Sequence, residues 1–228
     1  MRSSFFVKIL AIACGIGGVG ILAWVFLPIF FYEFTAPPLM SYLSPLPDNT
    51  QAANSTNGSF DDTKASNWFV GSNPSDFKKG SVTFYNLSIP RLGISDAVVA
   101  VGGEDLSQSL IQYPGTALPG RPGNATIFGH SVLPQFYSAT NYLTIFSDLP
   151  SLQKGDGISI RSDGISYEYR VEEKFEVLPT DVQVLEQNLS DSFLTLVTCV
   201  PPGDPRRPRR LIIRARIVPL QNTNTGQN

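Results

Sequence analysis

A stretch without any charged residue, from Ile9 to Tyr32, limits what the N-terminal part of this chain can become. It is long and apolar enough to cross a bilayer as one helix, whereas a cleaved signal peptide has a shorter apolar region that is followed by small residues. Arg2 and Lys8 precede the stretch and Glu33 follows it, which favours a cytoplasmic N-terminus and an exported body. The sequence therefore predicts a cytoplasmic tip and transmembrane anchor over residues 1–32. A cleaved signal is the alternative.

The composition excludes several classes of function. The formal net charge of −2 gives no general basic surface for nucleic acid. The two cysteines, Cys14 and Cys199, and the single histidine, His130, are too few for a zinc cage of Cys and His, which needs four ligands. Because Cys14 falls inside the predicted anchor, it cannot form a disulfide with Cys199 in the exported body. The sequence predicts no nucleic-acid partner, no metal and no cofactor.

Behind the anchor, the chain divides by composition into three parts. Residues 33–79 are rich in Pro, Ser, Asn, Thr and Asp without apolar periodicity, and they are predicted to be a flexible extracytoplasmic stalk. Residues 80–219 form the body, which is long enough for one domain with its own core. The polar residues 220–228 are predicted to be a disordered tail.

The body consists of short runs with β-strand character, separated by Gly and Pro. The runs cover residues 81–89, 96–101, 124–129, 157–162, 165–177, 193–199 and 210–218. Apolar and charged residues alternate within 165–177, which is typical of a half-buried strand, and 162–165 predicts a hairpin turn. Weak helical signals occur at 106–112 and 145–149. Many short strands with frequent turns predict an all-β body, either a closed barrel or a sandwich.

Cys199 ends the apolar run "TLVTC", in which strand alternation places Thr195, Val197 and Cys199 on one face. A lone cysteine of this kind is either a small buried hydrophobe or, beside fixed positive charge, a reactive thiolate. Six arginines crowd into residues 206–216, and one of them at the start of the next strand could hold a carbonyl or an oxyanion. His130 is either a surface or core histidine, or the acid–base partner of that thiolate.

Several motifs in a fixed order resemble the sortase family of cell-wall transpeptidases. They are "LSIPRLGI", "YPGTALPGRPGNATIFGH", "VLPTDVQVL", "TLVTC" and "RRLIIRA", and the resemblance covers residues 81–218. It implies a closed, eight-stranded sortase-like β-barrel with short helices, in which the cysteine and the histidine lie on adjoining strands.

The resemblance also assigns roles to individual residues. Cys199 matches the nucleophile, His130 the acid–base residue and Arg210 the positioning arginine. Arg209 is the alternative to Arg210, because the loop after the cysteine varies in length within the family. Thr195 matches the first threonine of the family's TLxTC motif, a residue of the substrate-groove wall.

A segment before the cysteine strand matches the loop with which sortases grip their sorting signal. Val182, Val184 and Leu185 lie in it and are expected to contact the apolar Leu and Pro of such a signal. Glu104, Asp105 and Asp181 are too scattered in the sequence to predict the calcium site that some sortases have.

The resemblance implies a membrane-anchored cysteine transpeptidase. It would cleave an LPXTG-like signal on secreted proteins through a thioacyl intermediate and transfer the acyl fragment to an amine of a peptidoglycan precursor. The chain lacks the Asp-Pro-aromatic motif of pilin-assembling sortases, which favours protein anchoring, although Trp68 and Phe69 could serve as a lid. One alternative is an extracytoplasmic cysteine protease that uses the same residues. The other is a non-catalytic binding module for an anionic wall polymer or lipid.

Overall fold

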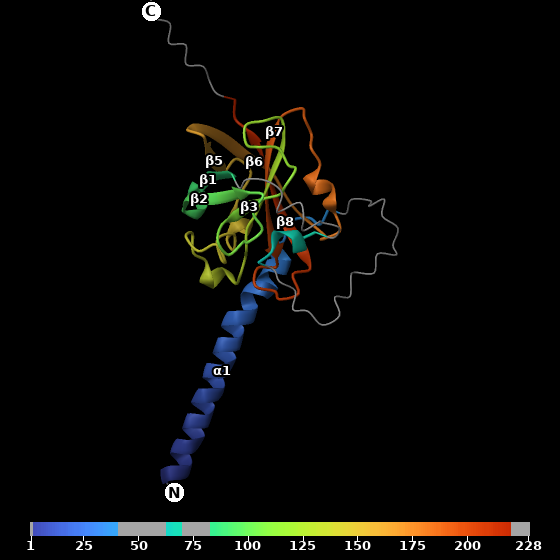
Figure 1. The fold of residues 1–228 in the computed structure, drawn as a ribbon. Helices are drawn as coiled ribbons and strands as arrows, with labels where there is room; N and C mark the ends of the chain where they lie inside the picture. Colours follow the sequence, from blue (N-terminus) through green and yellow to red (C-terminus); the bar gives the residue numbers. More distant parts are fainter. Residues whose placement is uncertain (1, 41–62, 70–82, 220–228) are drawn as a thin grey trace, which may run out of the picture.

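The computed structural model describes residues 2–40, 63–69 and 83–219 (Figure 1). The predicted tail and most of the predicted stalk lie outside these ranges. Two pieces of the predicted stalk lie within them, and both are packed rather than free. Residues 33–40 continue and follow the N-terminal helix, and residues 63–69 lie on the barrel.

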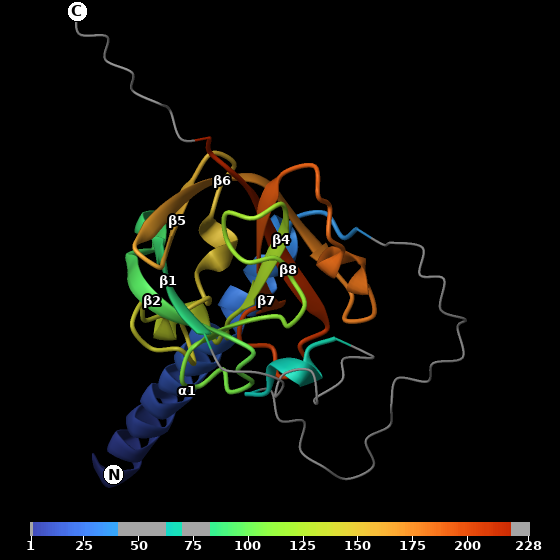
Figure 2. The same cartoon turned by 45° about the horizontal axis from the view of Figure 1, so that its top comes forward.

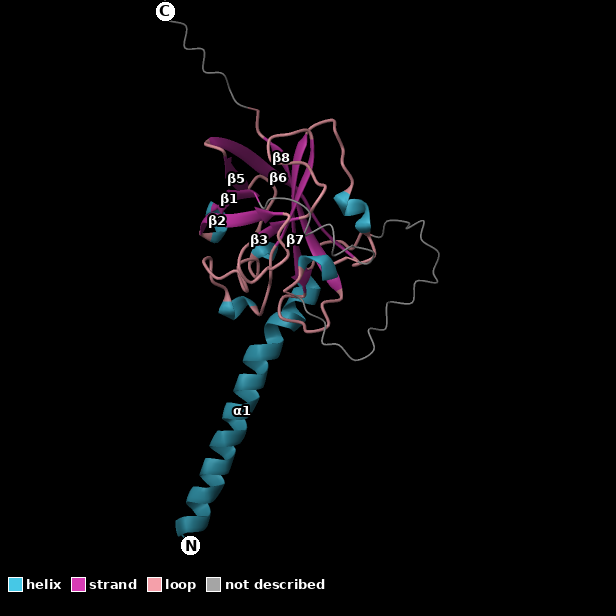
Figure 3. Cartoon of the chain, in the orientation of Figure 1, coloured by secondary structure: helices cyan, strands magenta, loops and turns pink. Residues whose placement is uncertain are grey.

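Helix α1 (Arg2–Thr35) contains the predicted anchor and ends a few residues after it. Its part Phe6–Thr35 is, among the described residues, the one helix long and apolar enough to cross a membrane. Figure 1 shows α1 projecting from one end of a barrel of strands. Figure 3 shows the short helical turns among the loops around that barrel.

Eight strands close into the barrel, which confirms the predicted architecture. They are β1 (Thr83–Ile89), β2 (Ile94–Val101), β3 (Leu110–Gln112), β4 (Gly123–Phe128), β5 (Gly157–Ser162), β6 (Ile165–Val177), β7 (Ser192–Val200) and β8 (Arg209–Ile217). Their order around the barrel is β1-β2-β3-β4-β7-β8-β6-β5. The pairs β2/β3 and β4/β7 are parallel, and the other pairs are antiparallel.

Short 3-10 helices interrupt the loops. They are η1 (Ala65–Asn67), η3 (Pro90–Leu92), η4 (Pro134–Phe136), η5 (Leu149–Ser151) and η6 (Val182–Leu185). The predicted hairpin between β5 and β6 is confirmed. Its two central residues, Asp163 and Gly164, have φ angles of 51° and 78°, the left-handed conformation that tight hairpin turns require.

The helical signals of the body were wrong. Within 106–112, Leu106 and Leu110 have helical spacing and both are buried, but Leu110 begins strand β3. That strand pairs with β2 on one side and with β4 on the other, so tertiary pairing overrides the local pattern. Residues 145–148 form turns, and Leu149 begins the 3-10 helix η5.

Alternation along β7 divides the apolar residues of the body between two clusters. Leu194 and Leu196 belong to the cluster that fills the barrel. Val197 and Cys199 belong to a second cluster on the outer face of the same strands. The predicted face of β7 is therefore confirmed, and it carries the candidate nucleophile on the outside of the barrel wall.

Candidate active site

Three neighbouring strands, β4, β7 and β8, bring the three predicted catalytic residues to one place. β4 and β7 are parallel with Phe128 opposite Val197, so His130 and Cys199 are level, two residues further along each chain. β7 and β8 are antiparallel with Cys199 directly opposite Arg210. Residues at these positions share one face of the sheet. The thiol therefore lies between the imidazole and the guanidinium.

All three side chains are nearly removed from water. The exposed fractions are 4% for Cys199, 4% for His130 and 3% for Arg210. Burial lowers the pKa of the Arg210 guanidinium, and charge on Cys199 acts in the opposite direction. Charges on neighbouring groups interact strongly at such a site, because few waters screen them.

The residue before His130 has to be glycine. A Cβ at Gly129 would lie 2.4 Å from the ring of Phe146 and 2.6 Å from the side chain of Leu110. The Thr198 hydroxyl donates to the Gly129 carbonyl at 2.8 Å, and the backbone N–H of Phe146 donates to the His130 carbonyl at 2.9 Å. The Gly-His pair is thus held on both sides, which fixes the imidazole relative to the cysteine strand.

A pocket of about 250 Å³ opens beside Cys199. It lies between the loop after His130, which contributes Leu133 and Phe136, and the loop that joins β7 to β8. The hydroxyl of Ser131 donates to the Cys199 carbonyl at 2.6 Å and ties the first loop to the cysteine strand. A cavity therefore adjoins the residue that carries the candidate nucleophile.

Arg210 is held in its position by main-chain carbonyls. Its Nε donates to the carbonyl of Trp68 at 3.1 Å, and its Nη1 donates to those of Arg207 at 2.9 Å and Arg209 at 3.2 Å. The guanidinium carbon also lies 5.7 Å from the centre of the Trp68 ring. A guanidinium anchored in this way is preorganised, so it can bind a carbonyl oxygen without first being ordered.

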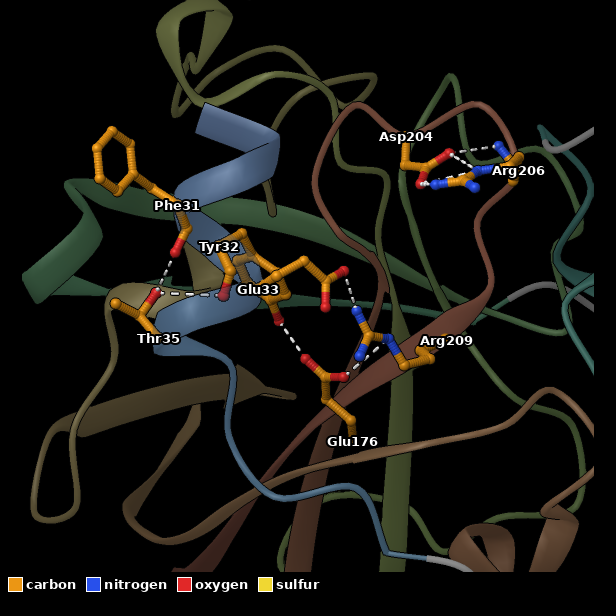
Figure 4. Close-up of polar contacts among 8 residues, drawn as sticks. All are labelled: Phe31, Tyr32, Glu33, Thr35, Glu176, Asp204, Arg206 and Arg209. Carbon is orange, nitrogen blue, oxygen red and sulfur yellow. Dashed lines mark hydrogen bonds and ion pairs between the residues drawn. The ribbon is translucent and has the colours of Figure 1, made fainter. Parts of the chain in front are cut away.

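Arg209 points to the other face of β8, away from Cys199. Figure 4 shows it between Glu176 at the end of β6 and Glu33 of α1, with N–O distances of 3.1 and 2.5 Å. The Tyr32 hydroxyl donates to the second oxygen of Glu176 at 2.6 Å. Burial raises the pKa of Glu176, while the Tyr32 hydrogen bond and the Arg209 charge oppose that rise. The structure thus brings Arg210, and not Arg209, to the cysteine.

The loop between β7 and β8 contains two further arginines, Arg206 and Arg207. Arg206 is exposed and pairs with Asp204 at 2.6 Å, which lowers the pKa of that carboxyl (Figure 4). Arg207 is half-buried, lines the pocket and accepts a hydrogen bond from Arg210 through its carbonyl. Arg206 is therefore a solvated charge, whereas Arg207 is part of the pocket wall.

The arginines later in β8 have structural contacts. Arg214 donates to the Val184 carbonyl at 3.4 Å, and its guanidinium lies over the Phe175 ring. Arg216 pairs with Glu172 at 3.0 Å. Most of the positive charge after Cys199 therefore ties the barrel wall to its neighbours.

Segment 63–69 lies over the active site. Trp68 stacks on Phe128 at 5.4 Å between ring centres and meets His130 edge-on at 5.7 Å, and Phe69 also contacts Phe128. Both aromatic side chains are buried in the outer cluster with Cys199. In Figure 2, this segment (teal) crosses near the ends of β4, β7 and β8. Residues 63–69, which were predicted to be part of the flexible stalk, therefore form a cover over the active site.

Glu104, one of the carboxylates considered for calcium, pins this cover in place. Its side chain accepts from the Ser66 hydroxyl at 2.6 Å, and its carbonyl accepts from the N–H of Ala65 at 3.0 Å. The N–H of Leu106 donates to the Thr63 carbonyl at 2.7 Å. Among the described residues, no group of three or more His, Cys, Asp or Glu side chains is arranged to hold a metal.

The predicted groove residues form a connected unit. The Thr195 hydroxyl donates to the Asn124 side chain at 2.7 Å, and the Asn124 amide donates to the Val184 carbonyl at 3.0 Å. Thr195 and Val184 are buried, whereas Val182 and Leu185 are partly buried against the outer cluster. Thr195 thus holds η6 through Asn124, a residue that sequence reasoning missed although it begins "NATIFGH".

Comparisons with known proteins agree with this geometry. The family model of the Sortase domain matches residues 87–218. Sortase A of Bacillus anthracis is 35% identical over 82 residues, which cover 36% of this chain and 35% of that protein. This match therefore spans about a third of the relative's length.

Solved structures of sortases share the fold. A Clostridium perfringens sortase D5 transpeptidase has a TM-score of 0.50 at 30% identity, over 59% of this chain and 78% of that one. A lid mutant of Corynebacterium diphtheriae sortase A has a TM-score of 0.53 at 27% identity, over 64% and 76%. Since the family model covers more than half of the sequence and the cysteine, histidine and arginine meet on its barrel, the chain belongs to the sortase family of cysteine transpeptidases.

Proposed function

We propose that this protein is a membrane-anchored sortase that cleaves an LPXTG-like signal and transfers the acyl fragment to an amine of the cell wall. The observation that carries the proposal is the buried thiol of Cys199, level with His130 on one neighbouring strand and opposite Arg210 on the other. Residues 80–219 are the catalytic domain of this proposal, and the substrates are secreted proteins with a C-terminal sorting signal.

The first half of the reaction forms a thioester. The Cys199 thiolate attacks the carbonyl carbon of the signal's threonine, and the electron pair moves onto the carbonyl oxygen beside the Arg210 guanidinium. When the tetrahedral intermediate collapses, the bond from this carbon to the next residue's nitrogen breaks. His130 gives its proton to the departing amine, and the acyl fragment remains on the sulfur.

The second half regenerates the enzyme. An amine of a peptidoglycan precursor attacks the thioester carbon and loses a proton to His130, after which the Cys199 thiolate leaves. The pocket beside Cys199 offers a route for this amine that does not cross the covered groove. In the groove, Val182 and Leu185 are the partly buried apolar side chains we assign to the signal, while Thr195 and Val184 support them from below.

The anchor belongs to the proposal as a retained helix. Tyr32 is buried in the core cluster of the barrel, and its hydroxyl binds Glu176. Cleavage near Thr35 would remove that contact. Protease applied to intact cells should trim the exported body and leave α1 in the membrane. A mature chain that starts near Thr35 would identify α1 as a cleaved signal.

The test of the activity is the identity of the product. The full chain in detergent is incubated with LPXTG-like peptides, with and without an amine such as triglycine, and the products are identified by mass spectrometry. We expect a thioacyl adduct on Cys199 and an amine-linked product, both lost in Cys199→Ala. If every amine and every signal yields only hydrolysed peptide, the protein is a cysteine protease.

The binding-module alternative makes a different prediction. A module that binds an anionic polymer or lipid through its arginines should bind equally well after Cys199→Ala. Such binding without any thioacyl adduct in the wild-type chain would refute the enzymatic proposal.

A further inference from the structure

One face of the last part of α1 lies against the barrel, and the rest of the helix projects freely. From Phe6 onward, the buried or partly buried positions of α1 are Ala23, Val25, Pro28, Ile29 and Tyr32, and the last four have the spacing of one helical face. Side chains from Phe6 to Leu22 are exposed. The contacts of Trp24 with Gln135 and Phe136 mark the level at which the barrel begins alongside the helix.

A proline creates the contact at that level. Pro28 lies inside α1 and has no N–H, so the carbonyl of Trp24, four residues earlier, has no helical donor. The side-chain amide of Gln135 donates to this carbonyl at 3.3 Å. The next residue, Phe136, meets the Trp24 ring edge-on at 5.7 Å. The loop of η4 is thus docked on the membrane helix by one polar and one aromatic contact.

A second joint lies about 12 Å further along the helix. There Tyr32 and Glu33 bind Glu176 and Arg209 of the barrel (Figure 4). Immediately after the helix, residues 36–40 add main-chain bonds to the same strand, from Glu176 N–H to Pro38 at 2.9 Å and from Met40 N–H to Glu176 at 2.8 Å. Two joints at different heights leave the barrel little freedom to tilt or to rise on its anchor.

The apolar part of α1 that lies outside the contact with the barrel is about as long as a membrane is thick. At about 1.5 Å per residue, the part from Phe6 to Trp24 is about 28 Å long. The hydrocarbon core of a bilayer is about 30 Å thick. No length of α1 remains as a spacer between the membrane and the barrel. Phe136, which contacts Trp24, therefore lies where the hydrocarbon ends.

We propose that the η4 loop, residues 133–137, is a lipid-contacting surface of the catalytic domain. Phe136, which is 52% exposed, inserts into the outer interface of the bilayer beside Trp24. Phe136 and Leu133 also line the pocket beside Cys199, so that pocket opens at the level of the lipid headgroups. A reactant that is itself held in the membrane can then reach the thioester without leaving the bilayer surface. This inference rests on the proposed membrane anchoring.

The test measures the depth of single tryptophans in the full chain. The chain is reconstituted into phosphatidylcholine vesicles in a Trp24→Phe, Trp68→Phe background, with Phe136→Trp added. The matched control is Ile165→Trp, because Ile165 is 51% exposed and its hairpin lies at the end of the barrel away from the projecting helix (Figure 1). Emission is compared in vesicles of plain lipid and of lipid brominated at the upper part of the acyl chains.

We expect bromolipid to quench the tryptophan at position 136 strongly and to leave the tryptophan at position 165 unaffected. A third chain, with only Trp68→Phe, retains Trp24 as its sole tryptophan and reports on the anchor itself. If Trp24 is quenched and position 136 is not, the anchor stands and the lipid-contacting surface is refuted. If Trp24 is not quenched, the membrane anchor fails and this inference fails with it. Emission at 136 that depends on protein density instead of bromolipid would identify a second protein copy as the occupant, and would also refute the inference.

Discussion

Arg209 and Arg210 are adjacent in the chain, but their side chains lie on opposite faces of β8, so their loss should have different effects. Arg210→Ala removes the fixed cation opposite Cys199. Loss of one preorganised oxyanion donor typically costs about 100- to 1000-fold in turnover. We expect kcat for transpeptidation to fall by that order while the protein still folds, which its thermal unfolding transition would show.

Arg209→Ala is the matched control for this prediction. It removes a partner of the buried Glu176 and should lower stability while kcat of the folded fraction is retained. Arg206→Ala should change kcat little because Arg206 is exposed, and Arg207→Ala should change kcat little because the carbonyl that binds Arg210 is kept. A dead Arg209→Ala beside an active Arg210→Ala would reverse the assignment. If all four variants stay active, the positioning role passes to Arg214.

Glu176 should give the protein a specific dependence of stability on pH. Burial raises its pKa in the folded protein above the ordinary value of 4.5, and the negative charge of Glu33 adds to the rise. The hydrogen bond from Tyr32 and the positive charge of Arg209 lower the pKa, but by less. The folded state therefore holds this proton more tightly than the unfolded state does. The stabilisation of the folded state by this bound proton is fully present below pH 4.5, and it is lost as the pH rises through the raised pKa of Glu176.

Glu176→Gln should remove this dependence. The test is the free energy of unfolding by urea from pH 4 upward, compared between the wild type and the variant. We expect the wild type to lose stability relative to Glu176→Gln as the pH rises above 4.5. A constant difference over the whole range would show that Glu176 ionises equally in both states.

At the scale of elements, segment 63–69 lies over the active site, and we predict that it moves when a substrate binds. Trp68→Ala removes the ring that stacks on Phe128 and meets His130. We expect the thiol of Cys199 to react faster with a small alkylating reagent, and the thioacyl adduct to form faster. Both rates can be measured by mass spectrometry of quenched samples.

Ser66→Ala is a milder variant for the same question. It removes the hydrogen bond to Glu104 that pins the cover, without changing any ring beside the active site. It should raise the alkylation rate in the same direction and by less. Should both variants slow the reaction, segment 63–69 is part of the catalytic groove and not a cover.

At the scale of the whole molecule, the helix is part of the folded body as well as its anchor. A chain that starts after Met40 lacks Tyr32 and Glu33, so Glu176 and Arg209 lose two of their partners. It also lacks the main-chain bonds of residues 36–40 to β6. We expect this truncated chain to unfold at a lower temperature than the full chain in the same detergent.

Tyr32→Phe in the full chain isolates one contact. It keeps the ring in the core cluster and removes only the hydroxyl that donates to Glu176. Leaving a buried acceptor without its donor costs about 1–3 kcal/mol.

Equal unfolding midpoints for the truncated chain and the full chain would mean that α1 does not stabilise the barrel.

The sequence by itself determined what depends on neighbouring residues. The alternation in "TLVTC" predicted the outer face of β7, the Asp-Gly pair predicted the β5–β6 turn, and the uncharged stretch predicted α1. These features are local, because a strand repeats every two residues and a turn needs particular φ angles. The ordered motifs added the barrel and three candidate catalytic residues through resemblance to a family, and the structure brings those three together.

Only the tertiary structure decided what depends on residues far apart in the chain. Leu110 has helical spacing to Leu106, yet closure of the barrel recruits it into β3. Arg209 and Arg210 differ only in which face of β8 they occupy, and that became clear once the register with β7 was known. The contact of Tyr32 with Glu176 joins residues 144 positions apart. No local periodicity encodes such a pair. It exists only after the barrel has closed, because closure brings the carboxylate of Glu176 next to the end of the helix.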